Sequence, residues 1–302
     1  RDRSPSRGLG DVYKRQIMSD SSCDLEPEVV NELGIKIVPF NISIGDISFK
    51  EYVDKSKSEV YELMENCAEI PKTAQVTAFE FEEIFNDAYR NGYTDVIYVS
   101  ISSTGSATNS NAVMASKNFF EENPDAKGKF NIYVIDSKGY TAMYGYCVME
   151  AAKKAAKGAD AASIAAYIEE WCGSVAAYFV PMTLKYAKKS GRISAAAAFA
   201  GELLGLKPLI EMSDGGSKIH EKIRGEKNII PKIMNHVEAV MTPQTPYIML
   251  CGKDNTMAKE LEKEMIKKYG YKAEYYAHVG AAVSANAGPD LVGLACRRNM
   301  SK

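Results

Sequence analysis

Short hydroxyl side chains gather in three segments of this 302-residue chain, and each segment follows a stretch of residues typical of a buried strand. These segments are 19–24 (SDSSCD), 101–108 (ISSTGSAT) and 137–139 (SKG). A buried carboxylate must be hydrogen-bonded, and serine and threonine hydroxyls can donate to it without burying a fixed positive charge. The clustering predicts a row of short polar donors along one rim of the molecule.

The side chains that would turn one of these serines into a nucleophile are scarce. The chain has three histidines and lacks the GxSxG, Walker A, HExxH and GxGxxG patterns. We expect His220, on a strand-like stretch, and His236, in a charged helical stretch, to face solvent, and we keep His278 as a candidate for the site. Without a base or a cluster of metal ligands, the sequence predicts binding, with no catalytic residue and no metal.

Strand and helix patterns alternate through the first half of the chain. In chain order they lie at 35–44 (strand), 59–66 and 79–91 (helices), 95–101 (strand), 110–121 (helix), 131–136 (strand) and 143–157 (helix). Such alternation predicts an α/β domain with a mostly parallel sheet between two layers of helices. Ligands bind beyond the carboxyl ends of the strands in such sheets, which is where the hydroxyl-rich segments fall.

The second half mixes the two patterns without regular alternation. We expect helices at 159–171, 194–204, 229–241 and 256–269, and strands at 176–183, 206–212, 217–224, 247–251, 272–278 and 291–296. This order predicts a two-layer α+β domain with a mixed sheet. The expected organisation is a foreign or disordered segment at 1–16, an α/β domain at 17–158 and an α+β domain at 159–302.

Composition narrows the classes of partner. Lys and Arg number 37 against 39 Asp and Glu, so the net charge of -2 supplies no basic field for nucleic acid or an anionic membrane. The six cysteines are scattered and form no CxxC pair, which is typical of a reducing compartment. Because the apolar runs are too short to cross a bilayer, we expect a cytoplasmic protein that neither binds nucleic acid nor inserts stably into a membrane.

Several segments, taken in order, resemble the DegV family from residue 17 onward. They are 18–25 (MSDSSCDL), 34–39 (GIKIVP), 71–75 (PKTAQ), 101–108, Asp136 with Ser137, 184–194 (LKYAKKSGRIS), 205–208 (GLKP), and Lys222 to Arg224. The resemblance implies a two-domain protein that needs no cofactor and binds one long-chain fatty acid between its domains. The first domain would hold the carboxylate and the second the acyl chain.

The resemblance also implies a partner, because in some bacteria such proteins present the bound fatty acid to a fatty acid kinase. Two alternatives stay open. One is an enzyme acting on a small acyl or glycerone-type substrate, since the family's fold resembles the substrate-binding half of dihydroxyacetone kinases. The other is a binder of a different small anionic ligand.

Carried over residue by residue, the resemblance assigns the carboxylate site. Thr73 matches the family's carboxylate-binding threonine, and Ser102, Ser103 and Ser106 match its serine-rich loop, with Ser103 favoured as the second donor. The alternative is that these hydroxyls cap the neighbouring helices. Gly105 is expected to permit a close backbone approach.

Other positions complete the expected site. Arg192 matches the family's arginine, at the site mouth or on the partner-facing surface, with a helix-terminal ion pair as the alternative. Ser21 and Ser137 are further candidates from the other two hydroxyl-rich segments. For the acyl chain we expect a pocket lined by the alanine-rich stretch, against the alternative of tight helix packing. The pocket residues are Ala197, Phe199, Leu203 and Leu204.

Two positions depart from the family pattern. Ala74 stands where the family has a serine, and Asn286, in 286–289 (NAGP), stands where it has a histidine. Asn286 can still donate a hydrogen bond to a carboxylate through its amide, but it cannot carry charge. The identity of the ligand and of the partner therefore stays open.

Overall fold

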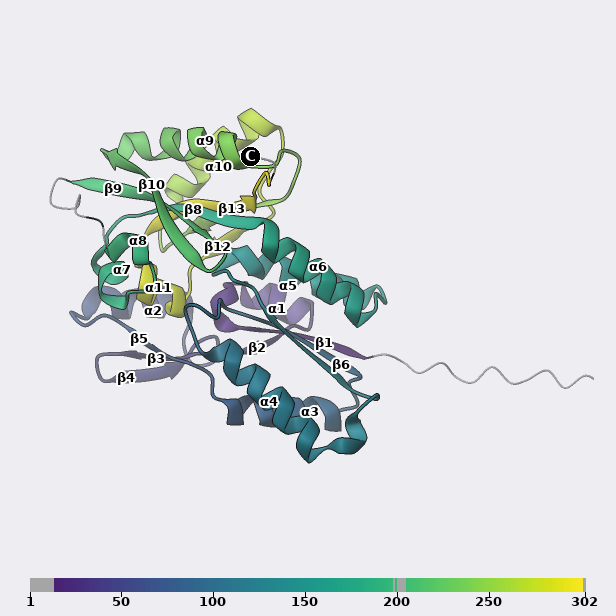
Figure 1. Cartoon of the computed structure of the whole chain (residues 1–302). Helices are drawn as coiled ribbons and strands as arrows, with labels where there is room; N and C mark the ends of the chain where they lie inside the picture. The colour runs from purple at the N-terminus through teal and green to yellow at the C-terminus, as the bar shows by residue number, and fades with distance from the viewer. Residues whose placement is uncertain (1–13, 198, 200–204, 301–302) are drawn as a thin grey trace, which may run out of the picture.

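The computed structural model describes residues 14–197, 199 and 205–300, which form two layered lobes (Figure 1). The first lobe is built on a parallel sheet with the strand order β2-β1-β6-β7. Its strands are β1 (Arg15–Asp20), β2 (Lys36–Val38), β6 (Asp95–Ser100) and β7 (Asn131–Asp136). Because all four are parallel, their carboxyl ends meet at one edge of the sheet.

Helices cover both faces of this sheet. On one face, α3 (Ala78–Arg90) and α4 (Thr108–Glu122) bury an aromatic cluster in which Phe81 packs against Tyr98 of β6. On the other lie α1 (Pro27–Glu32), α5 (Ala142–Ala156) and α6 (Ala161–Ser174). Helix α6 contacts α5, β6 and β7 of the first lobe, and the domain boundary near Gly158 stays a prediction.

A small antiparallel sheet with the order β4-β3-β5 extends the first lobe. It comprises β3 (Asn41–Ile44), β4 (Ile47–Lys50) and β5 (Lys72–Ala74), and α2 (Lys57–Asn66) lies in the connection between β4 and β5. The sequence predicted one strand over 35–44, but the structure divides it at Pro39, whose nitrogen has no proton to donate to a ladder. The pairing of β5 with β3 sets Thr73 opposite Ile42.

The second lobe contains a six-stranded mixed sheet with the order β10-β9-β8-β13-β11-β12. The strands are β8 (Val175–Pro181), β9 (Leu206–Ser213), β10 (Gly216–Arg224), β11 (Tyr247–Cys251), β12 (Tyr276–His278) and β13 (Leu291–Arg297). All neighbours pair antiparallel except β11 with β12. The fold class expected from the sequence is confirmed.

The two faces of the mixed sheet meet different partners. Helices α9 (Ile229–Val240) and α10 (Thr256–Tyr269) pack on the outer face. The inner face is directed toward the first lobe. Three short helices of the second half of the chain lie on this side of the sheet. These are α7 (Lys185–Ser190), α8 (Ser194–Ala197) and α11 (Ala281–Ala287).

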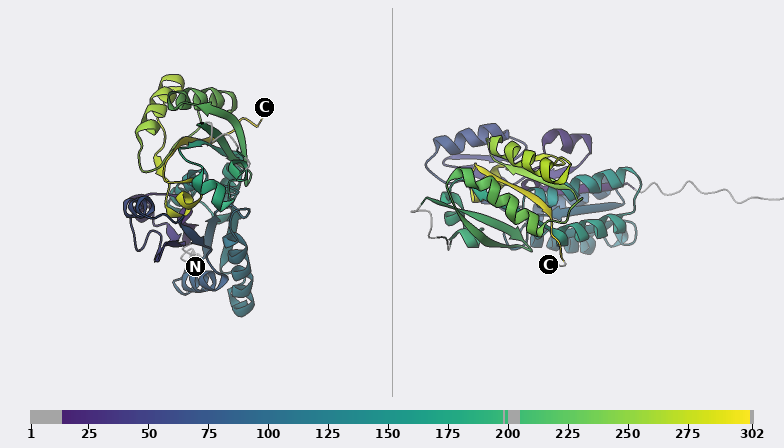
Figure 2. Two further views of the ribbon diagram at one scale, coloured as in Figure 1. Left: turned by 90° about the vertical axis from the view of Figure 1, so that its left-hand side faces the viewer. Right: turned by 90° about the horizontal axis from the view of Figure 1, so that it is seen from above.

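Helix α5 joins the lobes, because it contacts β1 of the parallel sheet and also β8, β11 and β13 of the mixed sheet. A single apolar cluster runs through this region and includes Ile97 of the first lobe and Leu250 of the second. The left view of Figure 2 shows the green and yellow second lobe stacked on the blue and purple first lobe. Within the described ranges, no helix combines the length and the apolar character needed to cross a membrane.

Candidate functional site

A cavity of about 710 Å³ lies where the two lobes meet, and its volume is typical of small-molecule sites. The first lobe contributes β5 and the loop at 101–107 that follows β6. The second lobe contributes the inner face of the mixed sheet, helix α11 and the turn at 190–194. The cavity therefore has one wall from each lobe, and the resemblance to the DegV family predicted a ligand between the two domains.

Polar side chains gather on the first-lobe side of the cavity. The lining there includes Thr73, Gln75, Ser103, Ser106, Ser110 and Tyr140. Gln75, Ser110 and Tyr140 were not expected from the sequence. The signals that could have found them are their positions, because Gln75 ends the PKTAQ segment and Tyr140 directly follows SKG.

A buried carboxyl group holds the start of the hydroxyl-rich loop. The backbone N–H of Ile101 donates to Oδ2 of Asp20 at 2.7 Å, and the hydroxyls of Ser22, Tyr98 and Tyr144 also donate to this carboxyl. Burial raises the pKa of Asp20 above its ordinary value, although these hydrogen bonds oppose the shift. Asp20 therefore fixes the position of the loop that lines the cavity.

Thr73 lines the cavity from β5, and Ser106 lines it from the loop that follows β6. Thr73 is exposed on β5, and its hydroxyl has no hydrogen-bond partner among the described residues. The Ser106 hydroxyl lies 2.9 Å from that of Thr108, and either oxygen can be the donor. Both hydroxyls can therefore donate to a ligand without breaking a hydrogen bond to a carboxylate.

Ser103 lines the cavity, but its hydroxyl already has a strong partner. It donates to Oδ2 of Asp136 at 2.5 Å, and the Ser103 backbone N–H donates to Oδ1 at 3.1 Å. A hydroxyl has one proton, so Ser103 can only accept from a ligand in this arrangement. Ser102 is fully buried, lies 2.8 Å from the Thr104 hydroxyl, and is not among the lining residues.

Gly105 allows the loop to lie against an aromatic wall. A Cβ atom at this position would fall 2.4 Å from the hydroxyl oxygen of Tyr140, closer than real side chains approach. The close approach expected at this glycine is therefore made to the protein's own Tyr140, which lines the cavity beside it.

Arg192 is the only charged side chain among the described residues that line the cavity. Helix α7 ends at Gly191, whose φ of 70° reverses the chain, and Arg192 follows directly. The guanidinium donates to the carbonyl oxygen of Ser190 at 2.7 Å, and no carboxylate of the described chain pairs with it. A cation in this position would attract an anionic ligand group.

Asn286 reaches the cavity from helix α11. Its Nδ2 donates to the Ala282 carbonyl oxygen at 2.8 Å, which leaves Oδ1 and one N–H for a ligand. The helix is held by carboxyls of the first lobe, since Gly280 N–H donates to Oδ1 of Asp24 at 2.8 Å and Ala282 N–H donates to Oε1 of Glu51 at 3.1 Å.

Burial raises the pKa of both of these carboxyl groups. It raises that of Asp24 to about 8 despite the charge of Lys57, and that of Glu51 to about 7 despite the hydrogen bond from Ser21. The Ser21 hydroxyl donates to Oε2 of Glu51 at 2.6 Å. Ser21 therefore supports the anchor of α11 and is not among the cavity-lining residues.

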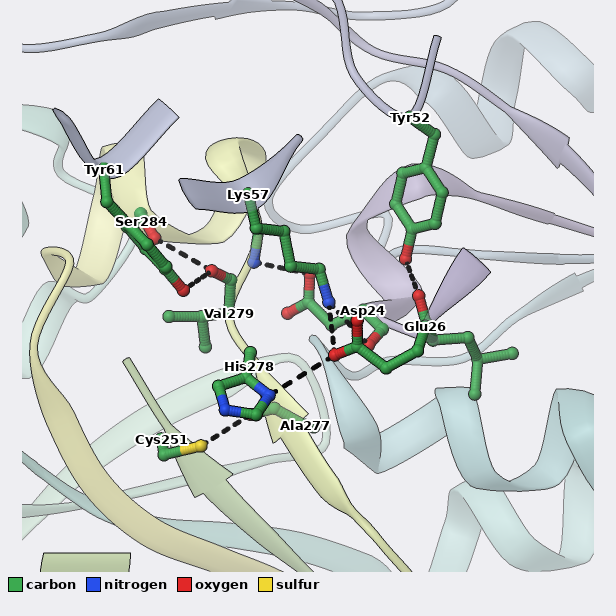
Figure 3. Close-up of polar contacts among 12 residues, drawn as sticks. Asp24, Glu26, Tyr52, Lys57, Tyr61, Cys251, Ala277, His278, Val279 and Ser284 are labelled. Carbon is green, nitrogen blue, oxygen red and sulfur yellow. Dashed lines mark hydrogen bonds and ion pairs between the residues drawn. The ribbon is translucent and has the colours of Figure 1, made fainter. Parts of the chain in front are cut away.

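His278 and Ser137 also lie outside the cavity lining. Figure 3 shows His278 pointing toward Glu26, whose Oε1 is 3.4 Å from Nδ1 of His278 and 2.9 Å from Nζ of Lys57. Burial acts to raise the pKa of Glu26, but the hydrogen bond from His278 and the Lys57 charge lower it overall. Ser137 is buried and bonds to the backbone of Gly139.

The apolar wall of the cavity comes from strands and from α11. Ala177 and Phe179 lie on one face of β8, and they are joined by Met212 of β9, Leu250 of β11 and Leu291 of β13. The i, i+2 spacing of Ala177 and Phe179 on a buried strand was the signal that could have identified this face of β8.

The expected acyl-chain residues are placed differently. Phe199 is buried but is not among the lining residues, and Lys222 lies 5.6 Å from its ring centre. Ala197 ends helix α8. Leu203, Leu204 and the side chain of Ala197 lie outside the described residues. Their part in a pocket stays a prediction.

Relatives and solved structures match nearly the whole chain. A DegV domain-containing protein from Caldanaerobacter subterraneus subsp. tengcongensis is 28% identical over 285 residues, which cover 94% of this chain and 98% of the relative. One from Clostridium perfringens is 28% identical over 287 residues, covering 92% and 95%. The region of similarity thus spans both lobes.

Two solved structures share the fold. A stearic acid-binding protein from Eubacterium ventriosum has a TM-score of 0.82 at 24% identity, covering 95% of this chain and 98% of its own. A fatty-acid-binding DegV family protein from Thermus thermophilus has a TM-score of 0.83 at 23% identity, covering 94% and 99%. A family profile described as an uncharacterised protein of the DegV family matches residues 14–299. This protein therefore belongs to the DegV family.

Proposed function

We propose that the protein binds one long-chain fatty acid in the cavity between its lobes and acts as a carrier rather than an enzyme. The observation that supports this most directly is the composition of the lining. One side is apolar, the other is rich in hydroxyls, and Arg192 is the sole charged group among the described lining residues. An amphipathic anion matches all three properties.

In this proposal the carboxylate lies near Thr73, Ser106, Asn286 and Arg192, while the Ser103 hydroxyl keeps its hydrogen bond to Asp136. The acyl chain follows the inner face of the mixed sheet. Burying a dozen methylenes contributes about 10 kcal/mol gross, at about 0.8 kcal/mol each, before the cost of association is subtracted. The acyl chain thus supplies most of the affinity, and the polar side chains of the cavity set the orientation of the fatty acid.

The ligands of the structural relatives support this choice of ligand class. The Eubacterium ventriosum protein is described with stearic acid, and DegV family proteins from Ruminococcus gnavus and Eubacterium eligens are described with vaccenic and heptadecanoic acid. These molecules share an unbranched apolar tail and one carboxylate. We infer the same class of ligand for this chain.

A carrier role, with presentation of the carboxylate to a partner such as a fatty acid kinase, is the finer part of the proposal. The described lining contains no histidine, cysteine or carboxylate that could act as a general base, which favours binding over turnover. Arg192 is exposed and could contact a partner as well as the ligand. The six cysteines are all free thiols, which favours a reducing cytoplasm as the location.

The test is to identify and quantify lipid in protein purified without detergent. Solvent extraction and mass spectrometry should find about one equivalent of a long-chain fatty acid, and the delipidated protein should take up oleate or palmitate. Protein that is empty and also binds neither acid would refute the proposal. Ester hydrolysis or phosphorylation of glycerone by the pure protein would favour an enzyme instead.

A matched pair of ligands tests the role of the cation. Palmitate and hexadecanol differ at the head group, so Arg192→Gln should weaken palmitate binding about tenfold and leave hexadecanol binding nearly unchanged. Equal losses for both ligands would mean that Arg192 supports the cavity wall and does not contact the carboxylate.

A further inference from the structure

Three side chains on the outer side of the second lobe form a cluster separate from the cavity. Glu211 of β9, His220 of β10 and His236 of α9 each offer a ligand atom, and these atoms all lie within 4.8 Å of one another. We propose that this cluster is a Zn²⁺ site that clamps helix α9 to the edge of the mixed sheet. Two imidazoles and one carboxylate are a ligand set that zinc accepts.

The cluster exists because β10 contains a bulge. The pairing of β10 with β9 shifts between Ile219 and Glu221, so His220 is an extra residue in the ladder. Strict alternation predicted that His220 and Glu221 face opposite sides, but both reach the helix side, where Glu221 pairs with Lys232 and His220 meets His236. The expectation that both histidines face solvent was therefore wrong.

The geometry is close to that of a metal centre. Zinc binds nitrogen and oxygen ligands at about 2.0–2.2 Å, so ligand atoms in a tetrahedral site are about 3.3 Å apart. Nε2 of His220 is in hydrogen-bond contact with Oε2 of Glu211, and the two imidazole ring centres are 4.0 Å apart. The three ligand atoms lie within 4.8 Å of one another, so changes of up to about 1.5 Å in their separations would bring them to tetrahedral spacing.

One ring nitrogen of His236 has no hydrogen-bond partner within the described part of the chain. This nitrogen, Nε2 of His236, is buried. Its ring packs edge-on against Tyr178, with the ring centres 4.9 Å apart, and this contact limits its rotation.

The carboxylate is also held in an orientation suited to a metal. The Ser213 hydroxyl donates to Oε1 of Glu211 at 2.7 Å, which leaves Oε2 facing the histidines. Such outer contacts orient the ligands of known metal sites. The nearby cation Arg298 is paired with Asp214 at 2.9 Å, so it does not neutralise Glu211 by direct contact.

The cluster is accessible to a metal ion. The side chains of His220 and Glu211 are 18% and 14% exposed, which admits an ion and leaves water for the fourth position. On the opposite face of β9, the neighbouring residue Met212 lines the cavity. A bound metal would therefore brace a strand that also forms the cavity wall.

The test uses the full chain without a histidine tag, freed of metal by a chelator. Calorimetric titration with Zn²⁺ in a non-coordinating buffer should give one site per chain and raise the unfolding temperature. His220→Ala and His236→Ala should each weaken binding at least tenfold and remove the thermal shift. Glu211→Gln, which keeps the shape of the side chain, should weaken it by a smaller factor.

Controls separate this site from the thiols and from the other histidine. His278→Ala and Cys67→Ser should leave Zn²⁺ affinity unchanged. Bound Co²⁺ should give tetrahedral visible bands without a sulfur-to-metal charge-transfer band. Wild-type protein that fails to bind 100 micromolar Zn²⁺, or histidine variants that fold and retain wild-type affinity, would overturn the proposal. If an alanine variant does not fold, Glu211→Gln and the Co²⁺ spectrum decide the outcome.

Discussion

Residues 19–24 and residues 101–108 both follow strands of the parallel sheet and both are rich in hydroxyl side chains, yet only the second segment lines the cavity. In the first segment, the hydroxyls of Ser21 and Ser22 donate to the buried carboxyls of Glu51 and Asp20. In the second, the Ser106 hydroxyl contacts that of Thr108 and has no carboxylate partner among the described residues. A hydroxyl is available to a ligand only where no carboxylate of the protein binds it first.

The largest effect should follow from removing the acceptor at the centre of the first segment. Asp20→Ala would leave the Ile101 N–H and the hydroxyls of Ser22, Tyr98 and Tyr144 without their buried acceptor. We expect the free energy of unfolding to fall by about 3 kcal/mol or more, measured by urea denaturation at neutral pH. A loss below about 1 kcal/mol would mean that this network is not what separates the two segments.

The second effect is a pH dependence that comes from Glu51. Its pKa rises from 4.5 in the unfolded chain to about 7 in the folded protein, so the folded state binds the proton more tightly. The contribution of this group to stability is full below about pH 4.5 and is lost as pH rises through about 7. The shift from 4.5 to about 7 changes the free energy of unfolding by about 3 kcal/mol, since each pKa unit corresponds to about 1.36 kcal/mol.

Glu51→Gln isolates that contribution, since glutamine does not titrate. The difference in unfolding free energy between wild type and variant should shift in favour of the variant as pH rises from 4 to 8. Glu59→Gln serves as the control, because hydrogen bonds from Ser56 lower the pKa of this exposed carboxylate, so the variant should not gain relative to wild type as pH rises. A constant difference across this range for Glu51→Gln would contradict a raised pKa.

A smaller effect tests the second segment and its neighbour Thr73. Because the Thr73 hydroxyl has no hydrogen-bond partner among the described residues, Thr73→Val should weaken fatty-acid binding roughly threefold to tenfold and leave stability unchanged. Ser137→Ala should do the reverse, since Ser137 is buried and bonds only to backbone. Fluorescence titration and thermal unfolding of both variants provide the comparison, and equal affinities for wild type and Thr73→Val would exclude Thr73 from the site.

The smallest effect should come from Ser103, whose hydroxyl shares one property with each segment. Its hydroxyl lines the cavity but donates to Asp136. We expect Ser103→Ala to change fatty-acid affinity less than threefold and to cost about 1 kcal/mol of stability. A larger loss of affinity, with the fold intact, would indicate that the ligand carboxylate displaces Asp136.

The layers of the fold could be predicted from the sequence because they rest on periodicity. The 131–136 pattern matches β7 at both ends, and the helices at 79–91 and 143–157 are displaced by one residue. The three-stranded sheet was missed because 35–44 has the composition of one continuous strand, and only Pro39 divides it. Local patterns indicate elements, whereas sheet partners depend on distant segments.

The candidate site was less predictable, because it depends on which groups the fold brings together. The resemblance to the DegV family predicted that Thr73, Ser106, Arg192 and Asn286 lie at or near a ligand site. All four line the cavity. The resemblance could not predict that Asp136 binds the Ser103 hydroxyl, since that contact joins residues 33 positions apart. The bulge that turns His220 toward His236 was likewise invisible, because a ladder irregularity leaves no periodic signal.

Helix α5 has a consequence for how the proposed fatty acid would enter and leave the cavity. It packs against both sheets, and the apolar cluster around it is continuous from one lobe to the other. Swinging the lobes apart would expose that apolar cluster to water, so we expect a clamshell motion to be costly. We expect loading and unloading to proceed by local breathing of the short segments that flank the cavity, detectable as faster amide exchange there than in α5.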